Sequence, residues 1–337
     1  MEGIEALEIL SRQTIPYSHK QGERVFGRIV FEMTFFTRDP HLPEGRERGI
    51  AVIDELRNEI PDSLYRWWWS QESKRSKPKR IGNHQLSATK DFCPDTTNQS
   101  FHFWQWDSED WEYDAPAHSL RIYYESNWGP YTPIGLIHLT VPLDWLIQQQ
   151  DGWALERFIQ LCDRIQPRFG YAGLYLATPV DSGALQWNTQ LAYPLLRRFP
   201  GINSAVPLGM LVPLSDYDQN KGCLPTVSWL TAVDEATLTL CGGEDMLRDA
   251  FGVPNFPVYI TKNKVSVVQA GPNPQTGDLD AGILLPHYGH VSRFFRPIRV
   301  LDADKQYNKA YGSEGSNLDW RIMQANQAEW LMRFEKM

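Results

Sequence analysis

The spacing of apolar residues along the chain predicts an irregular alternation of strands and helices. Strand-like stretches, rich in β-branched and aromatic residues, cover residues 24–36, 118–124, 133–141, 170–177, 227–232, 236–240, 258–260 and 265–270. Helical stretches cover residues 44–60, 143–165, 191–199, 244–251 and the tail from residue 316. This order predicts an α+β fold, in which helices flank a mainly antiparallel sheet.

Two local signals refine this pattern. Asp151 and Gly152 interrupt the helix over residues 143–165. The tail helix carries one aromatic and apolar stripe that is expected to face the core: Trp320, Met323, Trp330 and Phe334. No fixed-period repeat or low-complexity linker divides the chain, so residues 1–337 are expected to form a single domain. A weak subdivision near residues 201–221, where Pro, Gly, Ser and Asp accumulate, is the alternative.

The charge balance narrows the class of partner. Among 337 residues, 41 are Asp or Glu and 33 are Lys or Arg, so the net charge is −8. Nucleic-acid binding relies on neutralising phosphates, so this balance argues against direct nucleic-acid binding and is compatible with a basic protein partner. One basic run, KRSKPKR at residues 74–80, is expected to be a solvated loop.

The N-terminus and the cysteines favour a cytoplasmic location. Residues 1–5 show neither a positive segment nor a long apolar one, so no secretory signal is expected. No run approaches the ~18–20 apolar residues of a membrane helix, so no membrane contact is expected. Four cysteines without a CxxC pair are expected to be free thiols in a reducing cytosol: Cys93, Cys162, Cys223 and Cys241.

The segment FWQWDSEDWEYD at residues 103–114 is the strongest binding candidate. Large flat rings anchor protein interfaces because they bury much area with few rotors, and carboxylates attract a basic partner. The predicted partner-binding residues are Trp104, Trp106, Asp107, Glu109, Asp110, Trp111, Glu112, Tyr113 and Asp114. The alternative is a strand and turn whose rings enter the core, in which case Trp104 and Trp106 share a face. Three consecutive tryptophans at residues 67–69 are the next candidate. Side chains alternate along a strand, so the three rings cannot all point to one side, and at least one is expected to be partly exposed.

A search for catalytic chemistry finds no dinucleotide fingerprint, Walker loop, nucleophile elbow or H-E-x-x-H pattern. No cofactor and no metal are therefore expected. The alternative function is a metal-assisted enzyme that acts on a small molecule or peptide through Asp278, Asp280, His287 and His290. A turn in which Asp278 bonds backbone NH groups, and ring hydrogen bonds of the histidines in a loop, are the simpler interpretations.

Five short motifs occur in an order that resembles one known family. They read GYAG at residues 170–173, YPLLRRFPG at 193–201, VSWLT at 227–231, LCGG at 240–243 and AGPNPQTGD at 270–278. In this order they resemble the TsiV-like family of type VI secretion immunity proteins, over about residues 25–300. Each motif is short, and their succession carries the resemblance.

The resemblance implies a non-enzymatic antitoxin that binds a cognate secreted effector, and effectors of this family include nucleases acting on DNA. It assigns no interface residues. Together with the acidic balance, it predicts a cytoplasmic protein that neutralises a basic nuclease by occluding its active site or substrate groove.

Overall fold

The computed structural model describes residues 2–19, 22–38, 42–59, 66–71, 74–75, 79–80, 101–107, 114–124, 134–179, 192–204, 224–251, 256–299, 329–335 and 337. The strands in these ranges are β1 (Thr14–His19), β2 (Gly22–Arg38), β3 (Arg66–Gln71), β4 (Lys74–Arg75), β5 (Lys79–Arg80), β6 (Phe101–Trp106), β7 (Ser119–Tyr124), β8 (Ile134–Pro142), β9 (Pro167–Ala177), β10 (Leu230–Asp234), β11 (Val258–Ile260) and β12 (Val265–Gln269). The helices are α1 (Glu2–Ser11), α2 (Pro43–Glu59), α3 (Leu143–Ile147), α4 (Trp153–Ile165), α8 (Glu235–Thr239), α9 (Gly243–Phe251), α10 (Pro286–Phe294) and the short 3-10 helix η2 (Arg296–Ile298). Residues 192–198 are helical as well.

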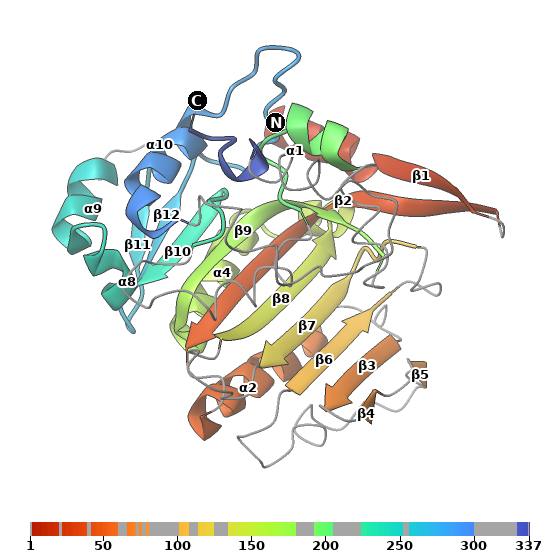
Figure 1. The fold of residues 1–337 in the computed structure, drawn as a ribbon, viewed down its shortest axis with the longest axis horizontal. Coiled ribbons are helices and arrows are strands. Elements are labelled where there is room, and N and C mark those ends of the chain that lie inside the picture. Colours follow the sequence, from red (N-terminus) through yellow and green to blue (C-terminus); the bar gives the residue numbers. More distant parts are fainter. Residues whose placement is uncertain are drawn as a thin grey trace, which may run out of the picture.

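The described strands form one sheet in the order β11-β12-β10-β9-β2-β8-β7-β6-β3-β4 (Figure 1). In addition, β1 pairs with β2, and β5 pairs with β3. Every pair of strands is antiparallel. The long strand β2 lies at the centre, because it pairs with both β8 and β9 along most of its length. The predicted α+β class, with helices flanking an antiparallel sheet, is confirmed.

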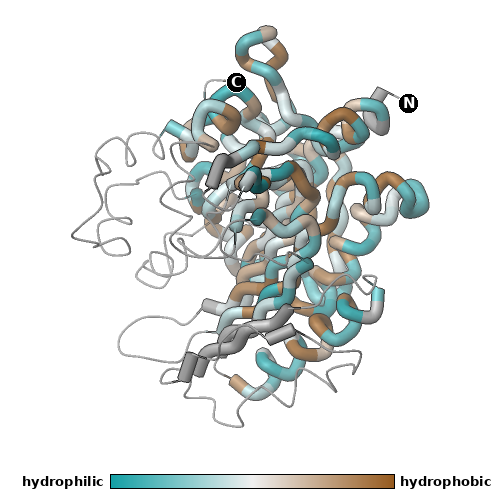
Figure 2. Tube along the Cα trace, turned by 90° about the vertical axis from the view of Figure 1, so that its right-hand side faces the viewer, coloured by the Kyte–Doolittle hydropathy of each residue, from teal (hydrophilic) through white to brown (hydrophobic). Residues whose placement is uncertain are grey.

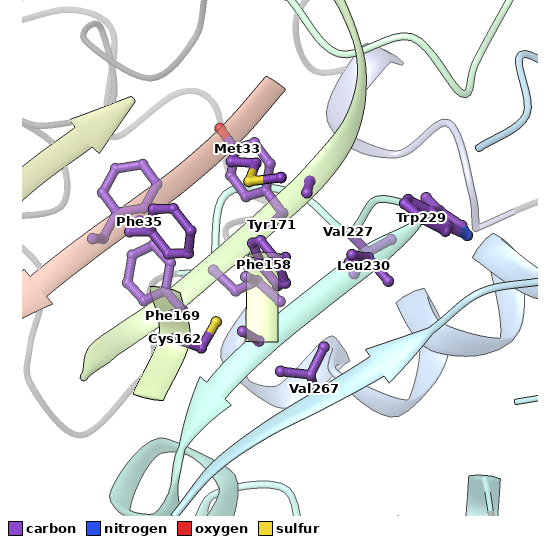
Figure 3. Packing of buried hydrophobic residues seen from close by; sticks show 14 of the residues in the cluster. Met33, Phe35, Phe158, Cys162, Phe169, Tyr171, Val227, Trp229, Leu230 and Val267 are labelled. Atoms are coloured by element: carbon purple, nitrogen blue, oxygen red, sulfur yellow. The ribbon is translucent and has the colours of Figure 1, made fainter. Parts of the chain in front are cut away.

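Side chains of β2 alternate between the two faces of the sheet. Phe35 stacks on Phe158 of α4, with ring centroids 5.1 Å apart, so this face packs against helices. Phe36 stacks on Phe169 of β9 at 4.6 Å on the other face. Figure 2 shows helices along one side of the sheet, and Figure 3 shows buried residues of the core, among them Phe35 of β2, Phe158 and Cys162 of α4, and Phe169 of β9. Both faces of β2 are therefore buried, which explains its long apolar run.

Most predicted elements are confirmed within a few residues, including the interruption between α3 and α4, where Gly152 has a positive φ of 84°. Three predictions are wrong. Residues 236–240 were expected as a strand but belong to α8 and the turn after it, because Asp234 caps this helix by accepting a hydrogen bond from Thr237 N at 2.8 Å. His287 and His290 lie on α10 and not in a loop. The basic run at residues 74–80 contributes two short strands, β4 and β5, that pair with β3.

Most of the segments that carry the family resemblance gather at one place in the fold. Gly201 N donates to Thr276 O at 2.8 Å, and Trp229 Nε1 donates to Gly271 O at 2.9 Å. A Cβ on Gly201 would lie 1.9 Å from Gln275 O, and one on Gly173 would lie 2.2 Å from Ser228 Oγ. These glycines are thus required by close approaches between the segments, so four of the five motifs, those at residues 170–173, 193–201, 227–231 and 270–278, meet at one packed junction.

A buried polar network surrounds Glu32, which is fully buried on β2. Its Oε2 accepts a hydrogen bond from Thr34 Oγ1 at 3.0 Å and lies 3.2 Å from His138 Nε2. Its Oε1 accepts one from Asn203 Nδ2 at 2.8 Å. Asn203 Oδ1 in turn accepts from Arg333 Nη2 at 3.0 Å, so the network extends to the C-terminal segment.

The C-terminal segment, residues 329–335, packs into the core. Leu331 and Phe334 are fully buried and Trp330 nearly so. Glu335 accepts hydrogen bonds from Arg299 Nη1 at 2.7 Å and Arg296 Nη1 at 3.0 Å. The predicted core role is confirmed for Trp330 and Phe334, while Trp320 and Met323 lie outside the described residues.

Cys162 and Cys241 are free thiols, as predicted, and burial raises the pKa of Cys241 to about 12. Cys93 and Cys223 lie outside the described residues. No helix in the described ranges has both the length and the apolar character that a membrane crossing needs.

Replacing Glu32 with Ala should lower the free energy of unfolding by about 3–5 kcal/mol, because the donors that surround the carboxylate stay buried without it. Chemical unfolding of the purified protein measures this. Glu23→Ala, at an exposed position on the same strand, is the matched control and should change stability by less than about 0.5 kcal/mol. Equal stability of the two variants would contradict the role of the network.

Candidate functional site

The predicted binding segment begins on β6, which lies between β3 and β7 in the sheet. The structure describes four of its nine predicted residues: Trp104, Trp106, Asp107 and Asp114. The other five, Glu109, Asp110, Trp111, Glu112 and Tyr113, lie outside the described residues. The role of all nine in partner binding stays a prediction.

Trp104 and Trp106 contact each other on one face of β6. Their rings form an edge-to-face pair with centroids 5.8 Å apart, so the expectation that they share a face is confirmed. Trp106 is 0% exposed, whereas Trp104 is only half-buried. The placement of Trp106 favours the core interpretation of that ring. A binding role is geometrically open to Trp104.

The register of the sheet sets Arg121 of β7 directly opposite Trp104. The guanidinium carbon of Arg121 lies 3.7 Å from the centroid of the Trp104 ring, which is a cation–π contact. Burial lowers the pKa of Arg121 to about 9, and the nearby hydroxyl groups of Tyr175 and Tyr123 partly offset this. The side chain therefore keeps its charge at pH 7 and holds the Trp104 ring in a fixed orientation.

Asp107 and Asp114 hold the chain that returns from β6 to β7. Asp107 accepts hydrogen bonds from Ala117 N and His118 N, each at 2.9 Å. Asp114 accepts one from Val25 N at 2.9 Å and lies 3.7 Å from Arg24 Nη1. Both carboxylates thus have a structural role, one before and one after residues 108–113.

The residues of the alternative enzyme site do not gather around a common centre. Asp278 forms a bidentate pair with Arg198, at 2.9 and 2.7 Å, which holds its pKa below the usual value. It also accepts from Asp280 N, as the turn interpretation predicted. His287 and His290 contact the ring of Phe256. Among the described residues, no group of three or more His, Cys, Asp or Glu is placed to hold a metal ion.

The cation–π contact of Arg121 with Trp104 and the polar network around Glu32 were not predicted from the sequence. A single Glu inside the apolar run of β2 is the signal that could have revealed the network, since a buried carboxylate needs donors. No signal in the sequence pairs Arg121 with Trp104, because that contact depends on the register of two strands.

Comparison with family models matches residues 50–334 to TsiV, described as type VI immunity for VRR-NUC. Among solved structures, the chain is similar to the Pseudomonas aeruginosa T6SS protein PA0821, with a TM-score of 0.75 and 21% sequence identity. That match covers 98% of this chain and 89% of the other, and it shows a shared fold. No curated protein matches the sequence.

Trp106→Ala should cost about 3–5 kcal/mol of folding free energy, because it empties a fully buried site. Trp104→Ala should cost less stability, and if Trp104 is an anchor it should weaken partner binding by ~2 kcal/mol or more. Thermal unfolding and titration calorimetry, run on each variant, separate the two effects.

The matched control is Trp145→Ala, which removes another half-buried tryptophan, on α3. It should leave partner binding unchanged. A folded Trp104→Ala protein with full affinity would exclude the anchor role and direct the search to residues 67–69.

Proposed function

Since the chain belongs to the TsiV family of type VI immunity proteins for VRR-NUC, we propose that it neutralises its nuclease by direct binding that occludes the active site or the substrate groove. The protein is a type VI immunity protein against a VRR-NUC nuclease effector, and its family is not enzymatic. The match over residues 50–334 is the observation that carries this proposal. This proposal replaces the alternative of a metal-assisted enzyme that acts through Asp278, Asp280, His287 and His290.

Inhibition by direct binding follows from the absence of enzymatic chemistry in the family, and occlusion is the simplest form of it. A protein that does not modify its target stops it only while bound to it, so inhibition depends on stoichiometry and affinity. A nuclease must contact phosphates, and it does so largely through Lys and Arg. The net charge of −8 supports the approach of this chain to such a surface.

The place of action follows from the target. An antitoxin must meet its toxin where the toxin acts, and the substrate of a DNA-cutting nuclease lies in the cytoplasm. We therefore assign the protein to the cytoplasm as part of this proposal. We also treat residues 1–337 as one domain. The continuity of the sheet supports this, since β10 and β12 from the C-terminal half extend the same sheet as β2 and β9.

Titrating the protein against a fixed amount of the purified nuclease should reduce plasmid cleavage in proportion and abolish it near a 1:1 ratio. The two proteins should also elute together in gel filtration. Cleavage by the nuclease alone is the reference, and heat-denatured immunity protein is the control. Complete protection at a strongly substoichiometric amount, with modified nuclease recovered, would show catalysis and overturn the proposal.

Charge reversal at Glu109, Asp110 and Glu112 tests electrostatic steering and leaves Asp107 and Asp114, whose carboxylates bind backbone NH groups, unchanged. The triple Lys variant should associate with the nuclease several-fold more slowly, with little change in dissociation, because charge that steers a partner acts mainly on encounter. The difference should shrink as salt is raised, since screening acts over ~8–10 Å at physiological ionic strength. Stopped-flow fluorescence measures both rates.

The control reverses three exposed acids on α9 and changes the net charge by the same amount: Glu244, Asp245 and Asp249. It should slow association less than the test variant does. An association rate that responds neither to the reversal at residues 109–112 nor to salt would falsify the steering role.

A further inference from the structure

Residues 277–285 form a loop that presents apolar side chains to solvent. Leu279, Ile283 and Leu284 are 40%, 58% and 53% exposed. These three, the apolar tip, make up three of the seven exposed large hydrophobic residues in the described part of the chain. Exposed apolar residues scattered singly are normal on a protein surface, but three within six residues need an explanation.

Asp278 fixes the conformation of this loop through its carboxylate. Its Oδ1 accepts hydrogen bonds from Asp280 N at 3.1 Å and Ala281 N at 3.2 Å. The bidentate pair with Arg198 ties the same carboxylate to the end of the helical residues 192–198. The loop is therefore attached to the body of the protein by a charged, directional contact.

Backbone contacts complete this arrangement. Asp278 and Ile283 exchange N–H···O bonds of 2.9 and 2.8 Å, and Leu279 N donates to Arg198 O at 2.9 Å. Gly277 and Gly282 adopt positive φ angles of 64° and 72°, which the tight return requires. The next residue after the tip, Leu285, is buried and anchors the start of α10.

This arrangement is typical of a preorganised interface loop. A loop whose backbone and side-chain contacts are already made loses little conformational freedom when a partner covers it. Burial of apolar side chains then contributes to affinity without that cost.

We propose that the apolar tip of residues 277–285 is a contact surface for the VRR-NUC nuclease effector. This inference rests on the proposed function and adds a second surface to the predicted one at β6. The partner is identified by charge as well: the net charge of −8 suits the basic margin of a nucleic-acid-binding groove, and Asp280, which lies 3.6 Å from Arg198 Nε, is 74% exposed beside the tip. A second copy of this acidic chain offers no such complement.

The test compares affinities for the purified effector by titration calorimetry. The double variant Ile283→Glu/Leu284→Glu should bind at least tenfold more weakly than the unmodified protein, mainly through faster dissociation. Its unfolding midpoint should stay close to the original, because both side chains are exposed. The milder pair Ile283→Ala/Leu284→Ala, which adds no charge, should weaken binding in the same direction and covers the case in which the Glu variant fails to fold.

Met246→Glu is the matched control, since Met246 is an exposed apolar residue on α9, outside this loop. It should leave affinity unchanged. If the unmodified protein itself does not bind or inhibit the nuclease, the proposed function fails. If it binds and both loop variants bind equally well, only this inference fails.

Sedimentation of the isolated protein distinguishes a second copy of the chain as the occupant. A dimer that dissociates in the Glu variant, with unchanged affinity for the nuclease, would assign the tip to self-association and overturn the proposal.

Discussion

A carboxylate buried at the centre of the sheet constrains the whole arrangement of the chain. Burying the carboxyl group of Glu32 requires hydrogen-bonding partners, and these are Thr34 on β2 itself, Asn203 and the ring of His138. Asn203 is in turn held by Arg333 near the C-terminus. Burial lowers the pKa of Arg333, so this guanidinium also needs its acceptors. Segments far apart in sequence must therefore dock together before any one of them is satisfied.

The same contacts extend from the core to the surface. Arg333 donates to Pro200 O at 2.7 Å, Gly201 donates to Thr276, and Arg198 holds Asp278. The loop at residues 277–285 is thus positioned by the segment that also satisfies Glu32. A surface attached to the core in this way keeps its shape in the free protein, which is the property that an inhibitor without chemistry needs for tight binding.

The class of fold and the family were predictable because they depend on local patterns and on the order of short motifs. The strand β2 and the break before α4 show this. The helix α8 was not predictable from apolar spacing, because its cap at Asp234 outweighs the strand-like residues that follow. Burial of Trp106 and exposure of Ile283 depend on tertiary contacts. A sequence does not distinguish a buried ring or aliphatic side chain from an exposed one. The candidate site was therefore only partly predictable.

The two candidate contact surfaces differ in chemistry and can therefore take different parts in binding one partner. Carboxylates such as those of the acidic segment raise the rate of encounter, whereas apolar side chains that a partner buries slow dissociation. An antitoxin that must capture a nuclease quickly and retain it needs both.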